Sequence, residues 1–447
     1  MSVKQVSGLP ILGNFLEYRK RKVEFLTELR DQHGDQVYFK LGKHKLLLIT
    51  NPEDIYWIEA KNAKNYVKAT NLRELVGDGI LISDGEKWKK QRKLIQPTFN
   101  HSSLLTMVDG MNRHVSRYCD RVDSDLRTGK APIEISASLK RLVFEIVGEA
   151  LFGEDLGSEF DGLRVGMEYM NQFLTKRFNQ IIPIPLSYPT PANLKFARIR
   201  SQMDRIIYKI IEQKSARIAS GNPQSDIVTQ MMLATDAETG KTMTREQMRD
   251  EAISLLLAGF ETTGHLLPWI LYLLSTHQDA QSRLREEIDS VVGSGTPTFD
   301  QTFELPFLKK VVDETLRLYP PLWAWTKKAV GTDQLRGTPI EAGSIIYLSP
   351  LLTHRHPKLW EKPDAFVPDR WTDELREKNK NAFFPFGMGP RSCVGKHFAM
   401  TEIQLVVIQL IQRFQLSLHS SEKVIPLYQV TIGMEKPLKL VLERRKT

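Results

Sequence analysis

The stretch Phe386-Gly387-Met388-Gly389-Pro390-Arg391-Ser392-Cys393-Val394-Gly395 decides how this chain is interpreted. It places one thiol, Cys393, among glycines, a phenylalanine and an arginine, just before an apolar helix predicted to begin near Lys396. Glycines let a backbone pass close to a flat ligand, and a helix N-terminus favours the ionised thiolate. Phe386 would keep water from the sulfur, and Arg391 offers charge to an anionic group. The pattern indicates a cysteine that is presented to a metal as a thiolate.

The spacing F-x-x-G-x-R-x-C-x-G resembles, at every fixed position, the haem-binding signature of the cytochrome P-450 family. In that family the thiolate is the axial ligand of the haem iron and promotes cleavage of the O–O bond. The resemblance therefore implies haem b as the cofactor, Cys393 as the metal ligand, and Phe386, Arg391 and Gly395 beside the haem. The alternative is a buried structural cysteine on a tight turn, which would not need the other spaced positions.

Composition limits the classes of protein that this chain can be. Hydrophobic residues make up 41% and charged residues 26% of its 447 positions, as in ordinary globular proteins, and no linker divides it, so we expect one domain over residues 1–447. Only Cys119 and Cys393 occur, which excludes a disulfide framework and favours the reducing cytoplasm. The apolar patch 9–12 is too short for a signal sequence or a membrane anchor. The net charge of +9 comes with no nucleic-acid motif, so we expect no nucleic-acid partner.

The order of predicted elements indicates a mainly α fold with small β-sheets, an α+β class. Strands are predicted at residues 37–41, 46–49 and 344–348, and helical spacing dominates from about 100 to 320. The resemblance implies the cytochrome P-450 fold, a triangular prism with a long central helix over the haem. We expect a β-rich lobe from residues 35–70 and 320–350 plus the C-terminal tail, and a helical lobe from 85–320 and 394–414. No G-x-G-x-x-G follows a strand, so we expect electrons to come from a separate protein.

The central helix is predicted from the apolar run 251–270, which a capping box of Thr244 and Gln247 precedes. Within it, Ala258-Gly259-x-Glu261-Thr262 resembles the family's oxygen-binding motif. The resemblance implies that Ala258 and Gly259 lie beside the haem, that Gly259 leaves room for oxygen, and that Thr262 and Glu261 are the catalytic pair that delivers protons. Pro268 should bend the helix past this motif.

Two further groups of residues are predicted to support the haem. Glu314 and Arg317, three apart on a helix, resemble the family's E-x-x-R, and Arg370 resembles the third member of that network, which supports the thiolate loop. Alone, a Glu-Arg pair at this spacing would be an exposed salt bridge of little value. The resemblance also implies that Trp88, Arg92 and Arg391 bind the haem propionates. Lys327 stands where relatives have an arginine, and it can supply the charge but not a bidentate fork.

The substrate pocket is predicted around residues 75–82 and 173–185, at Phe260, and at residues 322–326, with Leu322, Trp323 and Trp325 as candidate lining. Trp323 and Trp325 could equally belong to the core. The resemblance implies a monomeric monooxygenase that hydroxylates or epoxidises a hydrophobic fatty acid, terpene or steroid with O₂. Its two electrons would come from a ferredoxin or flavodoxin with its reductase, docked on the basic helix around Trp88. Two alternatives remain open: a peroxygenase or isomerase that needs no reductant, and a haem-thiolate sensor without turnover.

Overall fold

Two compact units, made of alternating segments of the chain, appear in the computed structural model, which describes residues 3–69, 73–153, 157–178, 180 and 184–445. Unit 1 comprises Met1–Asn71, Lys310–Cys393 and Pro426–Gly433, and unit 2 comprises Leu72–Lys309, Val394–Ile425 and Met434–Thr447. The helix α13 (Pro306–Leu318) passes from unit 2 into unit 1. The C-terminal tail that we expected in the β-rich lobe belongs instead with the helical unit from Met434 onward, because β13 pairs with strands there.

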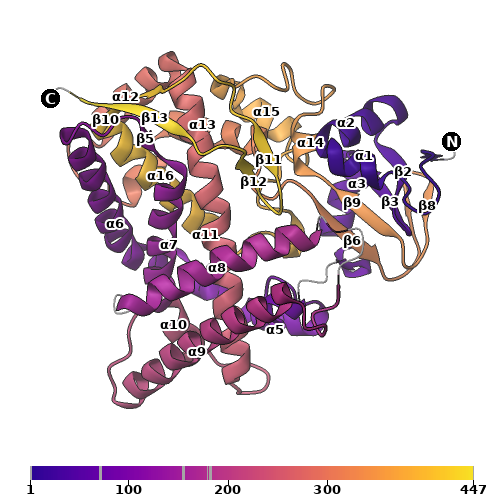
Figure 1. Cartoon of the computed structure of the whole chain (residues 1–447), viewed down its shortest axis with the longest axis horizontal. Coiled ribbons are helices and arrows are strands. Elements are labelled where there is room, and N and C mark those ends of the chain that lie inside the picture. The colour runs from indigo at the N-terminus through magenta and orange to yellow at the C-terminus, as the bar shows by residue number, and fades with distance from the viewer. Residues whose placement is uncertain (1–2, 70–72, 154–156, 179, 181–183, 446–447) are drawn as a thin grey trace. The chain divides into compact units, whose positions relative to one another are not determined.

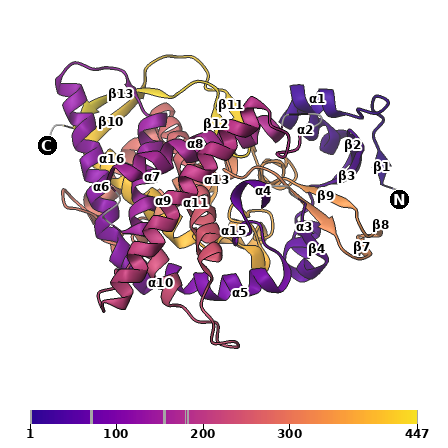
Figure 2. The same ribbon diagram turned by 60° about the horizontal axis from the view of Figure 1, so that its bottom comes forward.

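Unit 1 is built on a six-stranded sheet in the order β1-β2-β3-β9-β6-β4 (Figures 1 and 2). Its strands are β1 (Lys4–Gln5), β2 (Gln36–Leu41), β3 (His44–Ile49), β4 (Tyr66–Lys68), β6 (Trp325–Ala329) and β9 (Ile345–Leu348). The predicted strands are confirmed, and the turn at Gly42 joins β2 to β3 as an antiparallel hairpin. Two small pairs accompany the sheet: β7 (Asp333–Leu335) with β8 (Thr338–Ile340), and β11 (Pro426–Tyr428) with β12 (Ile432–Met434).

Short helices complete unit 1: α1 (Phe15–Lys20), α2 (Lys22–His33), α3 (Pro52–Tyr56), α14 (Pro350–His354) and α15 (Asp373–Lys378). The Asn51 side chain caps α3 by accepting the N–H groups of Glu53 and Asp54, and Pro52 occupies the first helical position, as the sequence predicts. A π-helical turn, Trp57–Lys61, follows α3 directly. The core under the sheet contains Leu47, Ile58, Tyr66, Ile346, Leu348 and Phe384.

Unit 2 is predominantly helical, as the sequence predicts. Its helices are α4 (Arg73–Val76), α5 (Gly85–Ile95), α6 (His101–Arg127), α7 (Ser136–Phe152), α8 (Gly157–Phe178), α9 (Pro191–Ala219), α10 (Ile227–Leu233), α11 (Arg245–Thr276), α12 (Gln278–Val291) and α16 (Lys396–Arg413). A three-stranded sheet joins β10 (Phe414–Leu418), β13 (Lys439–Arg444) and β5 (Ile133–Glu134). Among the residues that the structure describes, no helix is both long and apolar enough to cross a membrane.

The helix α11 runs through the middle of unit 2 and packs mainly on α7, with further contacts to α9, α10 and α16 (Figure 1). Its N-terminus has the predicted capping box: the Thr244 side chain accepts the N–H of Gln247, whose side chain accepts the N–H of Thr244. The helix continues through Pro268 to Thr276, and the bend expected at this proline stays a prediction. Such burial of a helix on several sides places its few polar residues inside protein.

Candidate functional site

The thiolate loop of unit 1, residues Phe384–Cys393, turns back on itself through backbone hydrogen bonds. The Cys393 N–H donates to the Phe386 carbonyl at 2.8 Å, and the Gly387 N–H donates to the Phe384 carbonyl at 3.0 Å. At the start of the loop, the Phe384 N–H donates to the ring nitrogen Nε2 of His354 at 3.0 Å. Burial lowers the pKa of His354 to about 3, so its ring is neutral and can accept this bond. The loop ends with Cys393 exposed, while Phe386 and Arg391 are half-buried.

Glycine is required at one position of this loop because two backbones touch there. Gly389 has φ +60°, and a Cβ on it would lie 2.3 Å from the Glu59 carbonyl oxygen, in the π-helical turn Trp57–Lys61. Gly387 also has a positive φ, of +70°, but a Cβ there would meet no atom closer than 3.8 Å. The loop therefore rests on the π-helical turn at Gly389 and needs Gly387 only for its backbone conformation.

The predicted Glu-Arg-Arg network forms inside unit 1. The Glu314 carboxylate is wholly buried and accepts two hydrogen bonds from Arg317 at 2.8 and 2.9 Å and one from Arg370 Nε at 2.9 Å. It also accepts the Val367 N–H at 2.9 Å and the Trp371 indole N–H at 3.1 Å. Burial lowers the pKa of the Arg317 guanidinium, which Glu314 opposes. An exposed salt bridge, the alternative interpretation, does not fit a fully buried carboxylate with five donors.

Lys327 lies on β6 and is buried beside a carboxylate that the sequence did not single out. Its Nζ is 3.1 Å from Glu59 Oε2, and both side chains are almost fully buried. Glu59 Oε1 accepts the indole N–H of Trp325 at 2.8 Å, so one carboxylate binds two residues of the same strand face. The structure thus places Lys327 in an ion pair, and its role toward a propionate stays a prediction.

On α11 of unit 2, a short stripe near the middle of the helix is uncovered, although most residues around it are buried. Ala258 is exposed and Thr262 is half-buried one turn later, whereas the neighbouring residues Phe260, Glu261 and Thr263 are buried. The Thr262 hydroxyl donates to the Ala258 carbonyl at 2.8 Å. The stripe exposes a small side chain and a hydroxyl, and its role in oxygen binding stays a prediction.

Glu261 faces away from this stripe, into a polar cluster between helices. Its Oε1 accepts from Asn171 on α8 at 2.6 Å and lies 3.2 Å from His265 Nδ1 and 3.8 Å from Lys140 Nζ on α7. Burial lowers the pKa of His265 to about 4, so the ring is neutral at pH 7. Lys140 is 29% exposed and connects the buried carboxylate to the surface.

We expected Gly259 to leave room for oxygen, but the structure gives a different reason for a glycine at this position. A Cβ on Gly259 would lie 2.9 Å from Val147 Cγ1 on α7, so the glycine lets α11 approach α7. The direction follows from helical geometry, because residue 259 is rotated by about 100° from Ala258. Ala258 keeps the open side of the helix small.

The Trp88 and Arg92 side chains lie one turn apart on α5 and are both half-buried, as W-x-x-x-R predicts. Arg92 Nε donates to Gln96 Oε1 at 2.9 Å. Of the exposed lysines on this helix, Lys87, Lys89 and Lys93 form ion pairs with Asp78, Glu86 and Glu238. Lys90 is exposed and has no carboxylate of the described residues within ion-pair distance. The basic character of α5 is therefore partly neutralised.

The candidate pocket residues fall mostly in the cores of their units. Phe260 is buried edge to face against Phe144 at 5.4 Å, and Trp323 is buried with its indole donating to the Gln429 carbonyl. Trp325 packs edge to face on Phe384, so the core interpretation of both tryptophans is favoured, while Leu322 is 40% exposed. Residues 179 and 181–183 and the side chain of residue 75, within the expected pocket segments, lie outside the described part of the structure.

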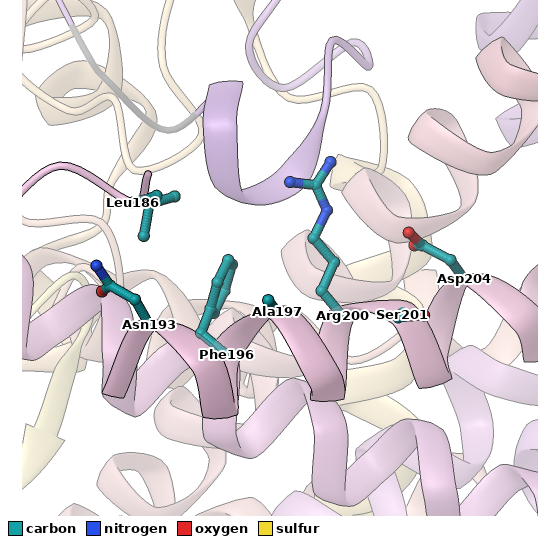
Figure 3. Close-up of a pocket in the computed structure, with 7 residues that line it drawn as sticks. All are labelled: Leu186, Asn193, Phe196, Ala197, Arg200, Ser201 and Asp204. Carbon is teal, nitrogen blue, oxygen red and sulfur yellow. The ribbon is translucent and has the colours of Figure 1, made fainter. Parts of the chain in front are cut away.

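A small hollow of about 210 Å³ lies beside α9 (Figure 3). It is lined by Leu186, Asn193, Phe196, Ala197, Arg200, Ser201 and Asp204. Asp204 is already engaged by Arg249 of α11 at 2.5 Å. None of the predicted site residues lines this hollow.

The residues of each unit fit a haem. Among the described side chains, no group of three or more His, Cys, Asp or Glu is placed to hold a bare metal ion. Unit 1 presents one exposed thiol, at the end of its packed loop. A single cysteine thiolate is the protein ligand that haem iron needs in a haem-thiolate protein. Unit 2 presents the open stripe of α11. Sequence reasoning missed Glu59, Asn171, Lys140 and His354, because no local motif marks residues that meet their partners only in the fold.

Comparisons with known proteins agree with this assignment. The family model described as Cytochrome P-450 matches residues 4–442. Cyclooctatin synthase of Streptomyces melanosporofaciens is 30% identical over 98% of this chain and 95% of its own length. Cyclooctat-9-en-7-ol 5-monooxygenase of the same organism is 28% identical over 92% of this chain and 88% of its own. Echinocystic acid 23-monooxygenase of Saponaria officinalis is 29% identical over 96% and 85%.

The family model covers nearly the whole chain, and it includes the thiolate loop, the buried Glu314 network and the open stripe of α11. Fold, cofactor and reaction class follow together, since this family uses haem b bound through a cysteine thiolate to insert oxygen into hydrophobic compounds with electrons from a redox partner. The chain belongs to the cytochrome P-450 family of haem-thiolate monooxygenases.

Proposed function

We propose that this enzyme hydroxylates or epoxidises a large apolar skeleton of the terpene or steroid class, with a fatty acid as the less favoured substrate. The carrying observation is the uncovered stripe of α11, where Ala258 and Thr262 offer one hydroxyl in an apolar helix. Two relatives are named for oxidising cyclooctat-9-en-7-ol and echinocystic acid, the second at a carbon numbered 23. A carbon with that number requires a large skeleton, which favours the same substrate class here.

In this proposal, different residues bind the iron, the ring and the carboxylates of the haem. Haem b, when bound, supplies the oxygen and electron chemistry, and the protein supplies its position and the protons. Cys393 would be the metal ligand. Phe386, Gly395 and Ala258 would contact the ring, whereas Gly259 faces α7. Trp88, Arg92, Arg391 and Lys327 would bind the carboxylates of the haem.

Proton delivery is assigned to Thr262 and Glu261. Glu261 faces away from the open stripe, toward Lys140, whose partly exposed side chain links this carboxylate to solvent. Thr262 would present the proton on the open face of the helix, at the position where oxygen is consumed.

The electron donor is proposed to be a ferredoxin or flavodoxin with its reductase, acting on a monomer. The support is the exposed face of α5, where Lys90 keeps an unneutralised charge for an acidic partner. Lys90→Glu should slow partner-driven reduction several-fold at low salt, and the difference should disappear at high salt. Lys89→Glu, whose charge Glu86 already neutralises, is the matched control. Equal rates for Lys90→Glu and wild type would contradict this docking face.

The proposed location is the reducing cytoplasm, since neither of the two cysteines forms a disulfide.

The reaction class is tested with labelled oxygen. Purified enzyme with a ferredoxin, its reductase and NADPH should place one atom of ¹⁸O₂ in a terpene product for each reductant consumed. Thr262→Ala should lower product formation roughly 100-fold while reductant consumption continues, because general acid catalysis contributes about that much. Full turnover on hydrogen peroxide alone would favour the peroxygenase, and ligand binding without any turnover would favour the sensor.

A further inference from the structure

Glu59 connects three elements of unit 1: its own π-helical turn, the strand β6 and the thiolate loop. Its carboxylate oxygens bind Trp325 and Lys327 on β6, at 2.8 Å to the indole nitrogen and 3.1 Å to the ammonium nitrogen. Its backbone carbonyl is the surface against which Gly389 of the thiolate loop packs. The side chain of Glu59 therefore contacts the lysine, while its backbone supports the loop that carries Cys393.

The π-helical turn that carries Glu59 is held from its outer side by one aspartate. Asp333 Oδ2 accepts hydrogen bonds from the Trp57 indole at 2.9 Å, from Asn62 Nδ2 at 2.9 Å and from the Tyr66 hydroxyl at 2.7 Å. These residues flank Glu59 on both sides along the chain. Such anchoring fixes where the Glu59 carboxylate lies, so its partner Lys327 is fixed too.

Lys327 stands in an unusual electrostatic position on its strand. It is directly opposite Lys68 on the antiparallel neighbour β4, and like charges at opposed positions repel. A buried ammonium is costly unless it is paired, and Glu59 supplies the counter-charge. Lys327 has three N–H donors, so one bond to Glu59 leaves two for another acceptor.

We propose that Glu59 is a positioning residue for haem binding, which holds Lys327 so that its ammonium group bridges the Glu59 carboxylate and a haem carboxylate. This inference rests on the proposed role of Lys327 toward the haem. A lysine can serve two carboxylates in this way because its three N–H donors diverge from one nitrogen. Glu59 also offsets the charge of Lys327, which lowers the reduction potential of the haem relative to an unpaired lysine.

The test is a set of charge variants in the haem-loaded enzyme, measured by redox titration. Glu59→Gln should shift the reduction potential upward, Lys327→Met should shift it downward, and the double variant should return close to wild type. Lys328→Met is the matched control, since Lys328 is exposed on the opposite face of β6. Trp325→Phe removes the other hydrogen bond to Glu59 without changing charge and should leave the potential in place.

Haem dissociation into an excess of apomyoglobin separates this inference from the role of Lys327. Lys327→Met should accelerate dissociation roughly tenfold, the loss expected for one charge-assisted hydrogen bond. An unchanged rate would remove Lys327, and with it Glu59, from haem binding. Faster haem loss in Lys327→Met together with no potential shift in Glu59→Gln beyond that of Lys328→Met would overturn the role of Glu59 alone. If Glu59→Gln does not load haem, the reduction potentials of Lys327→Met and the double variant are compared instead. These two proteins differ only by Glu59→Gln, so the comparison measures the effect of removing the same negative charge.

Discussion

Replacement of Glu314 by glutamine should destabilise the buried network that supports the thiolate loop. The variant keeps the size of the side chain but removes its charge, and it turns an N–H₂ group toward donors that now have no acceptor. Five donors meet this carboxylate, and at roughly 1.5–3 kcal/mol for each bond to a charged group their sum would equal or exceed the stability of most proteins. The bonds are therefore not additive. Removal of one partner of a buried ion pair lowers the free energy of unfolding by about 3–5 kcal/mol. We expect this loss here, since Arg317 stays buried without its counter-charge.

Urea denaturation of the haem-loaded enzyme measures this cost, with tryptophan fluorescence and the haem absorption band followed in parallel. We expect the transition of Glu314→Gln to move by about 3–5 kcal/mol and the thiolate-type spectrum to be lost early in it. Glu377→Gln is the control, because its ion pair with Lys380 is exposed on both sides and should contribute less than about 1 kcal/mol. A destabilisation of Glu314→Gln no larger than that of the control would refute the reasoning.

Three other predictions follow from burial and backbone geometry. Gly389→Ala should destabilise haem binding far more than Gly387→Ala, because only the first collides with another backbone, and equal haem retention would contradict this. Burial raises the pKa of Glu251 to about 8, so the folded state binds its proton more tightly than the unfolded state, and stability should fall between about pH 4.5 and pH 8 by at most about 1.4 kcal/mol per pH unit. Urea titrations at pH 5 and pH 8 should show a smaller fall in Glu251→Gln; an equal fall would exclude Glu251. Burial raises the pKa of Cys119 to about 12, so in haem-free native protein a thiol reagent should modify Cys393 and leave Cys119 unmodified, as peptide mapping can check.

The sequence was informative where a chemical requirement is written in neighbouring residues. The capping box at Thr244, the helical spacing of Glu314 and Arg317, and the loop before Cys393 each place their residues within a few positions of one another, so local geometry determines the outcome. The structure contains the capping box and the Glu314–Arg317 pair as predicted, and α16 begins at Lys396, directly after the loop, as predicted. The same locality explains why the strands of the β2–β3 hairpin could be predicted from alternation and a glycine turn.

Contacts between distant segments could not be predicted in this way. Glu59 and Lys327 are far apart in the sequence, and only the packing of the π-helical turn on β6 brings them together. Gly259 shows the converse case: the sequence singled it out, but the neighbour that requires a glycine there lies on α7 and has no sequence signal. The polar cluster around Glu261 likewise draws on α7 and α8, which pattern reasoning could not orient.

The claim on which the account depends most is that the Cys393 sulfur is the axial ligand of a haem. The most direct measurement is the absorption spectrum of the reduced protein under carbon monoxide, compared between wild type and Cys393→Ser. Thiolate ligation by Cys393 should give wild type a Soret band at the long wavelength typical of such ligation, and the variant should lack this band. A wild-type spectrum without that band, or the same band in Cys393→Ser, would contradict the account.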